Sequence, residues 1–153
     1  MSSEPPLFLL EDFLPYRLSV AANRVSRLFA GRYGSEFGLS IAEWRVMAVL
    51  GRFGALPARE VAIHTAMDKV KVSRAVAFLL RRKLTGRRAD RADARLQWLE
   101  LTPAGARMHA AIVPMARALE EELLTGLSAE EVIILRGALT RIAESLAERG
   151  GAD

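Results

Sequence analysis

The stretch that decides the fold is residues 57–84, which read PAREVAIHTAMDKVKVSRAVAFLLRRKL. Pro57 suits the first position of a short helix ending at Thr65, because a helix start makes no use of the backbone N–H that proline lacks. Asp68 suits the N-cap of a second helix, which we expect to run to about Leu84. Two helices joined by so short a turn predict a helix-turn-helix.

The second of these helices has one apolar face and one cationic face. Its apolar residues recur at the spacing of a helix packed on a core: Val72, Ala75, Val76, Leu79 and Leu80. Away from that face lie Lys69, Lys71, Ser73 and Arg74. Cations are unfavourable at a helix start, yet they suit a recognition helix whose first turns meet phosphates and base edges. One lysine alone is better explained as a solvated surface residue, whereas three cations and a hydroxyl together favour DNA.

Residues 85–101 predict a two-stranded hairpin, because the segments 85–89 and 96–101 flank the charged turn DRADAR. Cations expected to reach phosphates or a narrow minor groove are Arg81, Arg87, Arg88, Arg91 and Arg95. Asp93 is expected to pair with a neighbouring arginine. For Arg81, Arg82 and Lys83, a flanking phosphate contact and a solvated position fit equally well. A hairpin in this place makes residues 40–101 a predicted winged helix-turn-helix.

Helices are also predicted on both sides of this lobe, so the fold class is mainly α and residues 1–153 form one domain. The pairs Ser40/Glu43 and Ser128/Glu131 each have the spacing of a capping box at a helix start. The segments 8–37 and 103–149 carry apolar stripes that the small winged module does not need. We expect them to form a dimerisation region, the alternative being that they pack on their own domain. Residues 2–6 are expected to form a loose arm.

Composition narrows the function further. The chain of 153 residues carries a net charge of +4, but residues 52–96 alone hold twelve Lys or Arg against four Asp or Glu. Such a concentration is expected of a surface that meets phosphate, although a solvated basic face is the simpler alternative. The absence of cysteine excludes disulfides and thiolate metal sites. With neither a signal peptide nor a membrane span in the sequence, we expect a cytoplasmic protein with no membrane partner.

Signals for catalysis and for metal binding are weak. His64 and His109 are far apart in the sequence and have no further ligands at suitable spacing, so no metal site is predicted. The run Glu120–Glu122 is better explained as a solvated helix face than as paired catalytic carboxylates. Ser73 has no recognisable triad partners, and no glycine-rich phosphate loop is present. We therefore expect neither a cofactor nor an enzymatic activity.

Several short stretches together resemble the MarR family of bacterial regulators over about residues 14–146. They are LSIAEWR (39–45), REVA (59–62), MDKVKVSRAV (67–76), DAR (93–95) and LELTPAG (99–105). The resemblance implies a homodimer whose fourth helix enters the major groove and whose wing arginine, Arg95, enters the minor groove. It also implies a small ligand that binds between the dimerisation region and the DNA-binding lobe and releases DNA. Lys83 departs from the pattern, because the family usually has glycine there.

The residues expected to contact such an effector are Tyr16, Arg17, Asn23, Trp44 and Arg45. They combine aromatic surface with polar and cationic groups, as an aromatic carboxylate requires. For Trp44, plain core packing is the better interpretation, and for Tyr16 and Arg17 the two interpretations are close. The stretch 66–75 together with Ile112–Pro114 resembles a subgroup that controls aromatic-acid breakdown, some of whose members respond to coenzyme A thioesters.

The function predicted from the sequence is a homodimeric, sequence-specific regulator that binds double-stranded DNA. We expect a repressor released from a pseudo-palindromic operator by a small aromatic acid or its CoA thioester. The alternative is a winged helix that serves protein–protein contacts without DNA.

Overall fold

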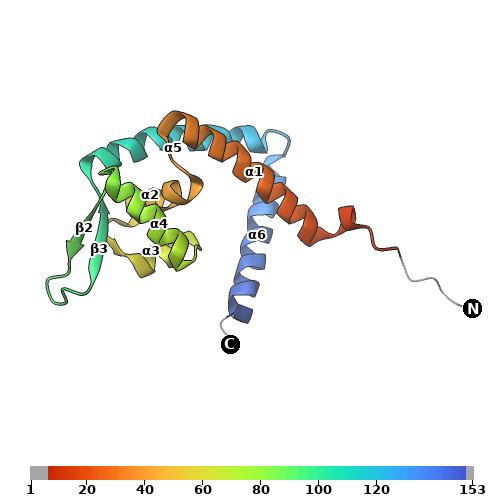
Figure 1. The fold of residues 1–153 in the computed structure, drawn as a ribbon. Coiled ribbons are helices and arrows are strands. Elements are labelled where there is room, and N and C mark those ends of the chain that lie inside the picture. The colour runs from red at the N-terminus through yellow and green to blue at the C-terminus, as the bar shows by residue number, and fades with distance from the viewer. Residues whose placement is uncertain (1–6, 151–153) are drawn as a thin grey trace, which may run out of the picture. The chain divides into compact units, whose positions relative to one another are not determined.

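The computed structural model describes residues 7–150, and the arm predicted for residues 2–6 lies outside them. The chain is mainly helical, as predicted, with one small antiparallel sheet. In chain order the elements are η1 (Leu10–Asp12), α1 (Leu14–Phe37), α2 (Ile41–Phe53), β1 (Leu56–Pro57), α3 (Ala58–Thr65), α4 (Lys69–Arg81), β2 (Thr85–Ala89), β3 (Gln97–Leu101), α5 (Pro103–Leu124) and α6 (Ala129–Gly150) (Figure 1).

The chain divides into two compact units, Met1–Met115 and Ala116–Asp153, with the boundary inside α5. Within the second unit, the Arg136 guanidinium on α6 lies 2.6 Å from a carboxylate oxygen of Glu120 on α5. That residues 1–153 form a single domain stays a prediction.

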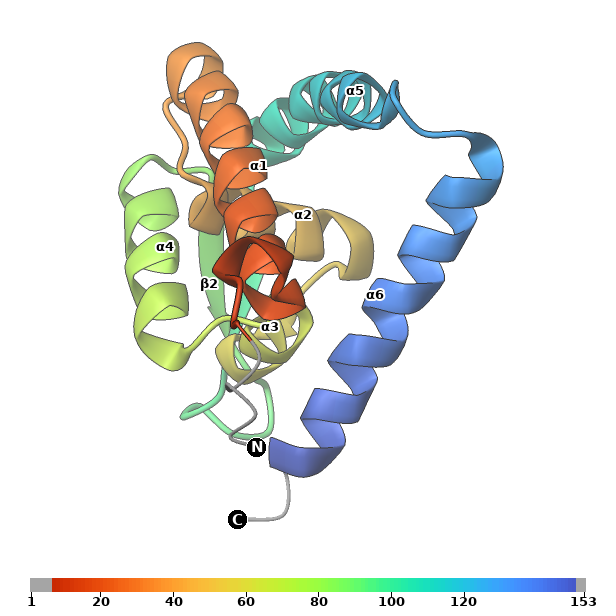
Figure 2. The same ribbon diagram turned by 90° about the vertical axis from the view of Figure 1, so that its right-hand side faces the viewer.

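The first unit contains a winged helix-turn-helix built on one core. Helices α2, α3 and α4 pack against one another (Figure 2), and both α2 and α3 contact β3. Apolar side chains from each of these elements and from α5 are almost fully buried: Val46, Met47, Leu50, Val61, Val72, Val76, Leu79, Leu99 and Ile112. The core face predicted for α4 is therefore confirmed, except that Leu80 is only half-buried. This core holds α4 and the wing on one support.

The sheet has the strand order β1-β3-β2, with both pairings antiparallel. The hairpin β2–β3 confirms the predicted wing, whereas the short strand β1 was not predicted. Leu56 of β1 pairs with Leu99, and Pro57 pairs with Trp98. Pro57 is also the N-cap of α3, so its predicted place as the first helical residue is wrong by one position. A two-residue strand has too few alternating side chains to be recognised from its sequence pattern.

The helix ends follow local chemistry that the sequence largely predicts. Both capping boxes form, with the hydroxyl oxygens of Ser40 and Ser128 accepting the backbone N–H of Glu43 and Glu131. Helix α4, however, ends at Arg81 rather than near Leu84.

Candidate nucleic-acid interface

Helix α4 begins at an ordered N-cap. A carboxylate oxygen of Asp68 accepts the backbone N–H of Lys71 at 2.8 Å. This hydrogen bond is the main reason that the pKa of Asp68 lies below its ordinary value, and the nearby Lys71 ammonium contributes to the same shift. The cap fixes where the helix starts, and thereby which side chains of its first turns face solvent.

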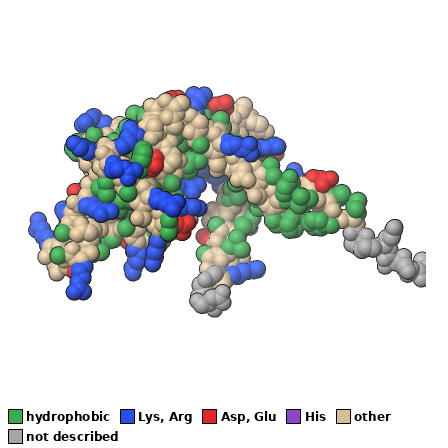
Figure 3. Space-filling model, in the orientation of Figure 1, with side chains coloured by type: hydrophobic (Ala, Val, Ile, Leu, Met, Phe, Trp, Pro, Cys, Tyr) green, Lys and Arg blue, Asp and Glu red, His purple; other side chains and the backbone are tan. Residues whose placement is uncertain are grey.

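The cationic face of α4 is exposed, as the sequence predicts. The side chains of Lys69, Lys71, Ser73 and Arg74 all face solvent, on the helix whose other face is buried. Lys71 lies 3.8 Å from a carboxylate oxygen of Asp68, whereas no acid within the described residues lies within 4.0 Å of Arg74. Arg74 and Arg81 are seven residues apart and so share one outward line of the helix. Figure 3 shows Lys and Arg side chains gathered over α4 and along the wing.

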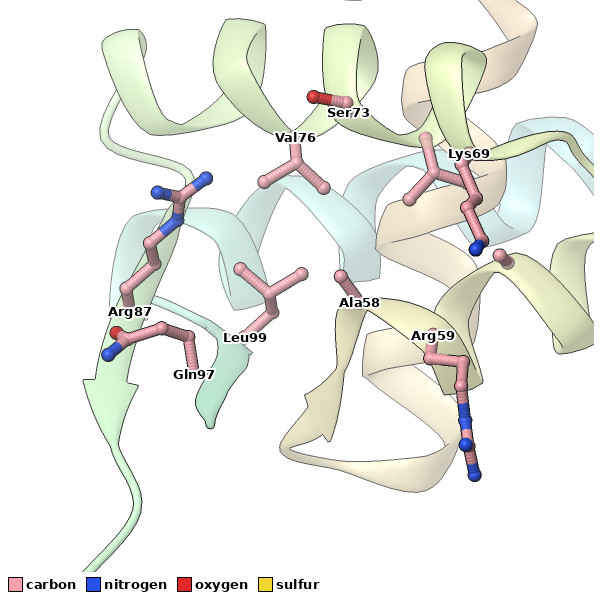
Figure 4. A pocket seen from close by; sticks show the side chains of 10 residues that line it. Ala58, Arg59, Lys69, Ser73, Val76, Arg87, Gln97 and Leu99 are labelled. Atoms are coloured by element: carbon pink, nitrogen blue, oxygen red, sulfur yellow. The ribbon is translucent and has the colours of Figure 1, made fainter. Parts of the chain in front are cut away.

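A pocket of about 450 Å³ lies between α3, α4 and the wing (Figure 4). Its interior is apolar and includes Val72, Val76 and Leu99, and its rim carries polar and cationic groups. The rim residues are Arg59, Lys69, Ser73, Arg87 and Gln97. Charge on this face is therefore contributed by α3 and β2 as well as by α4. Of these rim residues, only Arg59 has an acid within 4.0 Å among residues 7–150, with 3.6 Å between its guanidinium and the Glu60 carboxylate.

The tip of the wing presents Arg91 and Arg95 to solvent. Asp93 was expected to pair with a neighbouring arginine side chain, and that expectation is wrong in the structure. Its carboxylate instead accepts the backbone N–H of Arg95 at 2.9 Å, because a short acidic side chain readily reaches its own turn. No acid within residues 7–150 lies within 4.0 Å of the guanidinium of Arg91 or Arg95. Both cations are thus free to meet an anionic partner.

Two other cations, Arg82 directly after α4 and Arg88 on β2, have contacts within the chain. One guanidinium nitrogen of Arg82 donates to the carbonyl oxygens of Phe37 and Gly38, at 2.9 and 3.0 Å. Arg82 therefore contacts the end of α1, a role that the sequence did not predict, and its contact with a flanking phosphate stays a prediction. Arg88 keeps a looser contact, with 4.0 Å between its guanidinium and the Glu100 carboxylate.

The start of α5 fastens the wing to the end of α4. The Thr102 hydroxyl donates to the carbonyl oxygen of Lys83 at 2.7 Å and accepts the backbone N–H of Gly105 at 3.1 Å. The backbone N–H of Thr102 donates to the carbonyl oxygen of Leu84. A Cβ at Gly105 would lie 1.9 Å from that same oxygen, so only glycine fits there. Residues 101–105, with the sequence LTPAG, thus fix the position of the wing relative to the end of α4.

The five residues expected to contact an effector do not share one cavity. Trp44 and Arg45 line a pocket of about 210 Å³ between α1 and α2, together with Ser26 and Tyr33. Tyr16 and Arg17 line a separate depression of about 560 Å³ on the first turns of α1.

Asn23 lines neither of these pockets. Trp44 is half-buried between Tyr33, whose ring is tilted at a centroid distance of 5.7 Å, and His109, whose ring stacks on it at 5.5 Å, as core packing requires. Burial lowers the pKa of His109 below its ordinary value.

Known structures and sequences resemble this chain over most of its length. No family model matches the sequence. A probable transcriptional regulator from Pseudomonas aeruginosa is 33% identical, covers 88% of this chain and 99% of its own, and superposes with a TM-score of 0.80. A MarR family transcriptional regulator from Silicibacter pomeroyi is 28% identical, with coverage of 92% and 99% and a TM-score of 0.77. The chain belongs to the MarR family of transcriptional regulators.

Two further relatives of this MarR-family chain add detail. BpsR of Bordetella bronchiseptica, whose structure concerns regulation of DNA binding by 6-hydroxynicotinic acid, is 25% identical with a TM-score of 0.84 and coverage of 90% and 97%. The HTH-type regulator YwaE of Bacillus subtilis, which is uncharacterized, is 26% identical over 112 residues. That match spans 73% of this chain and 66% of YwaE, so it covers slightly less than two thirds of that relative.

In this MarR-family fold, the predicted DNA-contacting residues fall on two adjoining elements. All of them are exposed and lie on α4 or on the wing: Lys69, Lys71, Ser73, Arg74, Arg81, Arg88, Arg91 and Arg95. Their individual contacts stay predictions. Arg59 and Gln97 were not predicted from the sequence, because only the packing of α3 and β3 brings them to the rim of the pocket. Val70 was not predicted either; it is 59% exposed on the cationic face and suits a thymine methyl group.

Two features typical of other functions are absent from residues 7–150. No helix within residues 7–150 is both long enough and apolar enough to cross a membrane. In the same part of the chain, no three His, Cys, Asp or Glu side chains come together in a metal-binding arrangement.

Proposed function

We propose that this protein is a cytoplasmic, homodimeric transcriptional repressor that binds a pseudo-palindromic operator and has no enzymatic activity of its own. The observation that carries the proposal is the display of exposed cations on α4 and the wing above one buried core. Among them, Arg74, Arg91 and Arg95 have no acid within 4.0 Å in residues 7–150. In this arrangement α4 enters the major groove and the wing lies along the adjacent minor groove. A two-fold dimer would place its two copies of α4 at half-sites roughly 10 bp apart.

Arg74 is the central base-reading residue of this proposal. Its guanidinium has no acid partner in the described chain, and a free guanidinium can donate two parallel hydrogen bonds to guanine. Arg74→Ala should weaken specific binding by about 1–3 kcal/mol and relax the sequence preference. The matched control is Arg32→Ala, since Arg32 lies on α1 and is already paired with Glu36 at 3.5 Å.

A duplex titration at two salt concentrations tests this function directly. Affinity should fall steeply with salt, because each lysine or arginine that meets a phosphate releases counterions. If no salt-dependent duplex binding occurred and an acidic protein bound the same face, the protein-interaction alternative would replace this proposal. If Arg74→Ala and Arg32→Ala bound an operator with equal affinity and selectivity, the assignment of Arg74 would be wrong.

Dimerisation is supported by apolar side chains that remain exposed in a single copy. On α1 these include Leu14 and Leu28, which are 61% and 39% exposed. On α6 a stripe at helical spacing is exposed as well: Leu135, Leu139, Ile142 and Leu146. Apolar stripes of this kind gain most from a second copy that covers them.

We further propose that a small aromatic acid, or its CoA thioester, releases the repressor from DNA. The pocket between α1 and α2 offers aromatic surface from Tyr33 and Trp44 and a cation from Arg45. BpsR, whose DNA binding is regulated by an aromatic acid, supports this class of ligand. The test is release of a bound duplex by a panel of aromatic carboxylates, including 6-hydroxynicotinic acid, and their thioesters. Arg45→Ala should abolish the release of DNA by an active compound. Arg17→Ala tests the depression on the first turns of α1 in the same way.

A further inference from the structure

The loop at the tip of the wing is held by one carboxylate. One oxygen of Asp90 accepts the indole N–H of Trp98 at 2.9 Å. The other oxygen accepts the backbone N–H groups of Ala92 and Asp93, at 2.9 and 3.1 Å. A single side chain therefore ties the first residues of the loop to the strand that leaves it.

The two ends of the loop are joined by further hydrogen bonds. The backbone N–H of Asp90 donates to the carbonyl oxygen of Leu96 at 2.9 Å, and that of Leu96 donates to the carbonyl oxygen of Asp93 at 3.0 Å. The carboxylate of Asp93 accepts the backbone N–H of Arg95 at 2.9 Å. Residues 91–95 are nevertheless all exposed and bury no apolar side chain. Their conformation therefore depends on these polar contacts and not on packing.

The carboxylates of Asp90 and Asp93 do not neutralise the arginines of the loop. Each acid of the loop is engaged with N–H groups, and neither Asp90 nor Asp93 lies within ion-pair distance of Arg91 or Arg95. The acids shape the loop while the arginines keep their full charge for a partner. Bonds to the charged carboxylate also lower the pKa of Asp90, with the indole of Trp98 as the largest cause.

We infer that the Asp90–Trp98 hydrogen bond is a latch that positions Arg91 and Arg95 for the minor groove. Asp90 is thus a positioning residue for DNA recognition, acting through the arginines and not by touching DNA. The inference rests on the proposed DNA binding by the wing. It explains why a tryptophan occupies β3 directly opposite Arg88, where its indole can reach back to the loop.

A positioning role and a purely electrostatic role for Asp90 predict opposite changes in DNA affinity when its carboxylate is removed. Removing an acid from a DNA-binding surface should strengthen binding, because repulsion from phosphate is lost. The latch predicts the opposite for Asp90→Ala, which should weaken binding to a duplex with a narrow A·T-rich minor groove by about five- to tenfold, as for loss of one modest base contact. Trp98→Phe, which keeps the ring but lacks the donor, should weaken binding to a similar extent. Glu100→Ala is the matched control, since Glu100 is a wing acid that lies 4.0 Å from Arg88, and its removal should leave binding unchanged or tighten it.

A double-mutant cycle tests whether Asp90 acts through Arg95. With Arg95→Ala already present, Asp90→Ala should cost far less than it does in the wild type. The indole N–H resonance of Trp98, identified by its loss in Trp98→Phe, should shift in Asp90→Ala and exchange faster with water. Urea unfolding of each variant confirms that its fold is retained, and Trp98→Phe keeps the test available if Asp90→Ala does not fold.

The outcomes are distinct for the two proposals. A wild type that fails to bind any duplex would overturn the proposed function and the latch together. A wild type that binds duplex DNA, with Trp98→Phe binding equally tightly, would overturn the latch alone. Full additivity of Asp90→Ala and Arg95→Ala would do the same, because the two residues would then act independently.

Discussion

At the scale of single residues, Lys83 shows how this chain departs from its family at a cost to stability. Its φ of +57° places it in the left-handed region, within the turn that follows the end of α4 at Arg81. A residue with a Cβ adopts that conformation at a cost of roughly 1 kcal/mol, whereas glycine does not. Glycine is usual here in the family, and the backbone of this chain keeps the glycine-type conformation without the glycine.

Lys83→Gly should therefore raise the free energy of unfolding by roughly 0.5–1 kcal/mol, after allowance for the greater freedom of glycine in the unfolded chain. The measurement is the urea midpoint of unfolding. Arg81→Gly is the control, because Arg81 has helical geometry at the end of α4 and glycine there should destabilise. A midpoint for Lys83→Gly at or below that of the wild type would contradict the argument.

Gly105 is the converse case, a glycine that cannot be replaced. A Cβ would lie 1.9 Å from the carbonyl oxygen of Leu84, and a backbone oxygen cannot move aside as a flexible side chain can. We expect Gly105→Ala to destabilise the fold by several kcal/mol, about the size of a severe overpacking change. Gly31→Ala on α1, where a Cβ meets nothing within 4 Å, should instead stabilise the helix slightly. Thermal unfolding of both variants shows whether the loss of stability comes from the steric clash at Gly105 or from any replacement of glycine by alanine.

Thr85 carries a hydroxyl that is buried without a hydrogen-bond partner within the described residues. An unsatisfied buried hydroxyl costs free energy, and valine has the same shape without it. Thr85→Val should therefore stabilise the protein by about 1 kcal/mol. Thr85→Ser, which keeps the hydroxyl and loses the methyl group, should destabilise. The prediction fails if chemical denaturation ranks serine above valine at this position.

At the scale of elements, the sequence predicted those parts whose cause is local. The N-cap of α4, both capping boxes and the two strands of the wing depend on residues a few positions apart, and all are found. Contacts between distant segments were not predictable in this way. Arg82 reaches the carbonyl oxygens of Phe37 and Gly38 across more than forty residues of sequence, so its role had no local signal.

The start of α4 gives a prediction about pH. The pKa of Asp68 is lowered in the folded chain, so its contribution to stability is complete above about pH 4, the ordinary value for an aspartate in an unfolded chain. That contribution declines as the pH falls through the lowered folded value, because the protonated cap loses its charge. Asp68→Asn should keep the neutral cap and show a smaller loss of stability between pH 7 and pH 3 than the wild type. Urea unfolding at both pH values checks this, and an equal loss in both proteins would exclude Asp68 as a source.

At the scale of the whole molecule, the proposed DNA-reading surface lies within one chain, whereas the proposed operator with two half-sites needs two chains. Fold and family indicate the DNA-binding lobe directly, and the dimer is inferred from surface that a single chain leaves uncovered. A charge placed in an apolar interface must lose its hydration without a partner, and that cost opposes association. The central part of the α6 stripe is therefore the place to test the dimer.

Leu139→Glu should convert the protein from dimer to monomer at micromolar concentration, because Leu139 is 47% exposed in one chain and lies in the middle of the stripe. Thr140→Glu adds the same charge one residue away, about 100° round the helix, and should leave the dimer intact. Light scattering after gel filtration measures the mass of each. Since two half-sites are bound together only by a dimer, Leu139→Glu should also lose most affinity for a full operator while binding a single half-site as weakly as the wild type. A monomeric wild type, or a dimeric Leu139→Glu, would remove α6 from the interface and leave the lobe to bind DNA as a single copy.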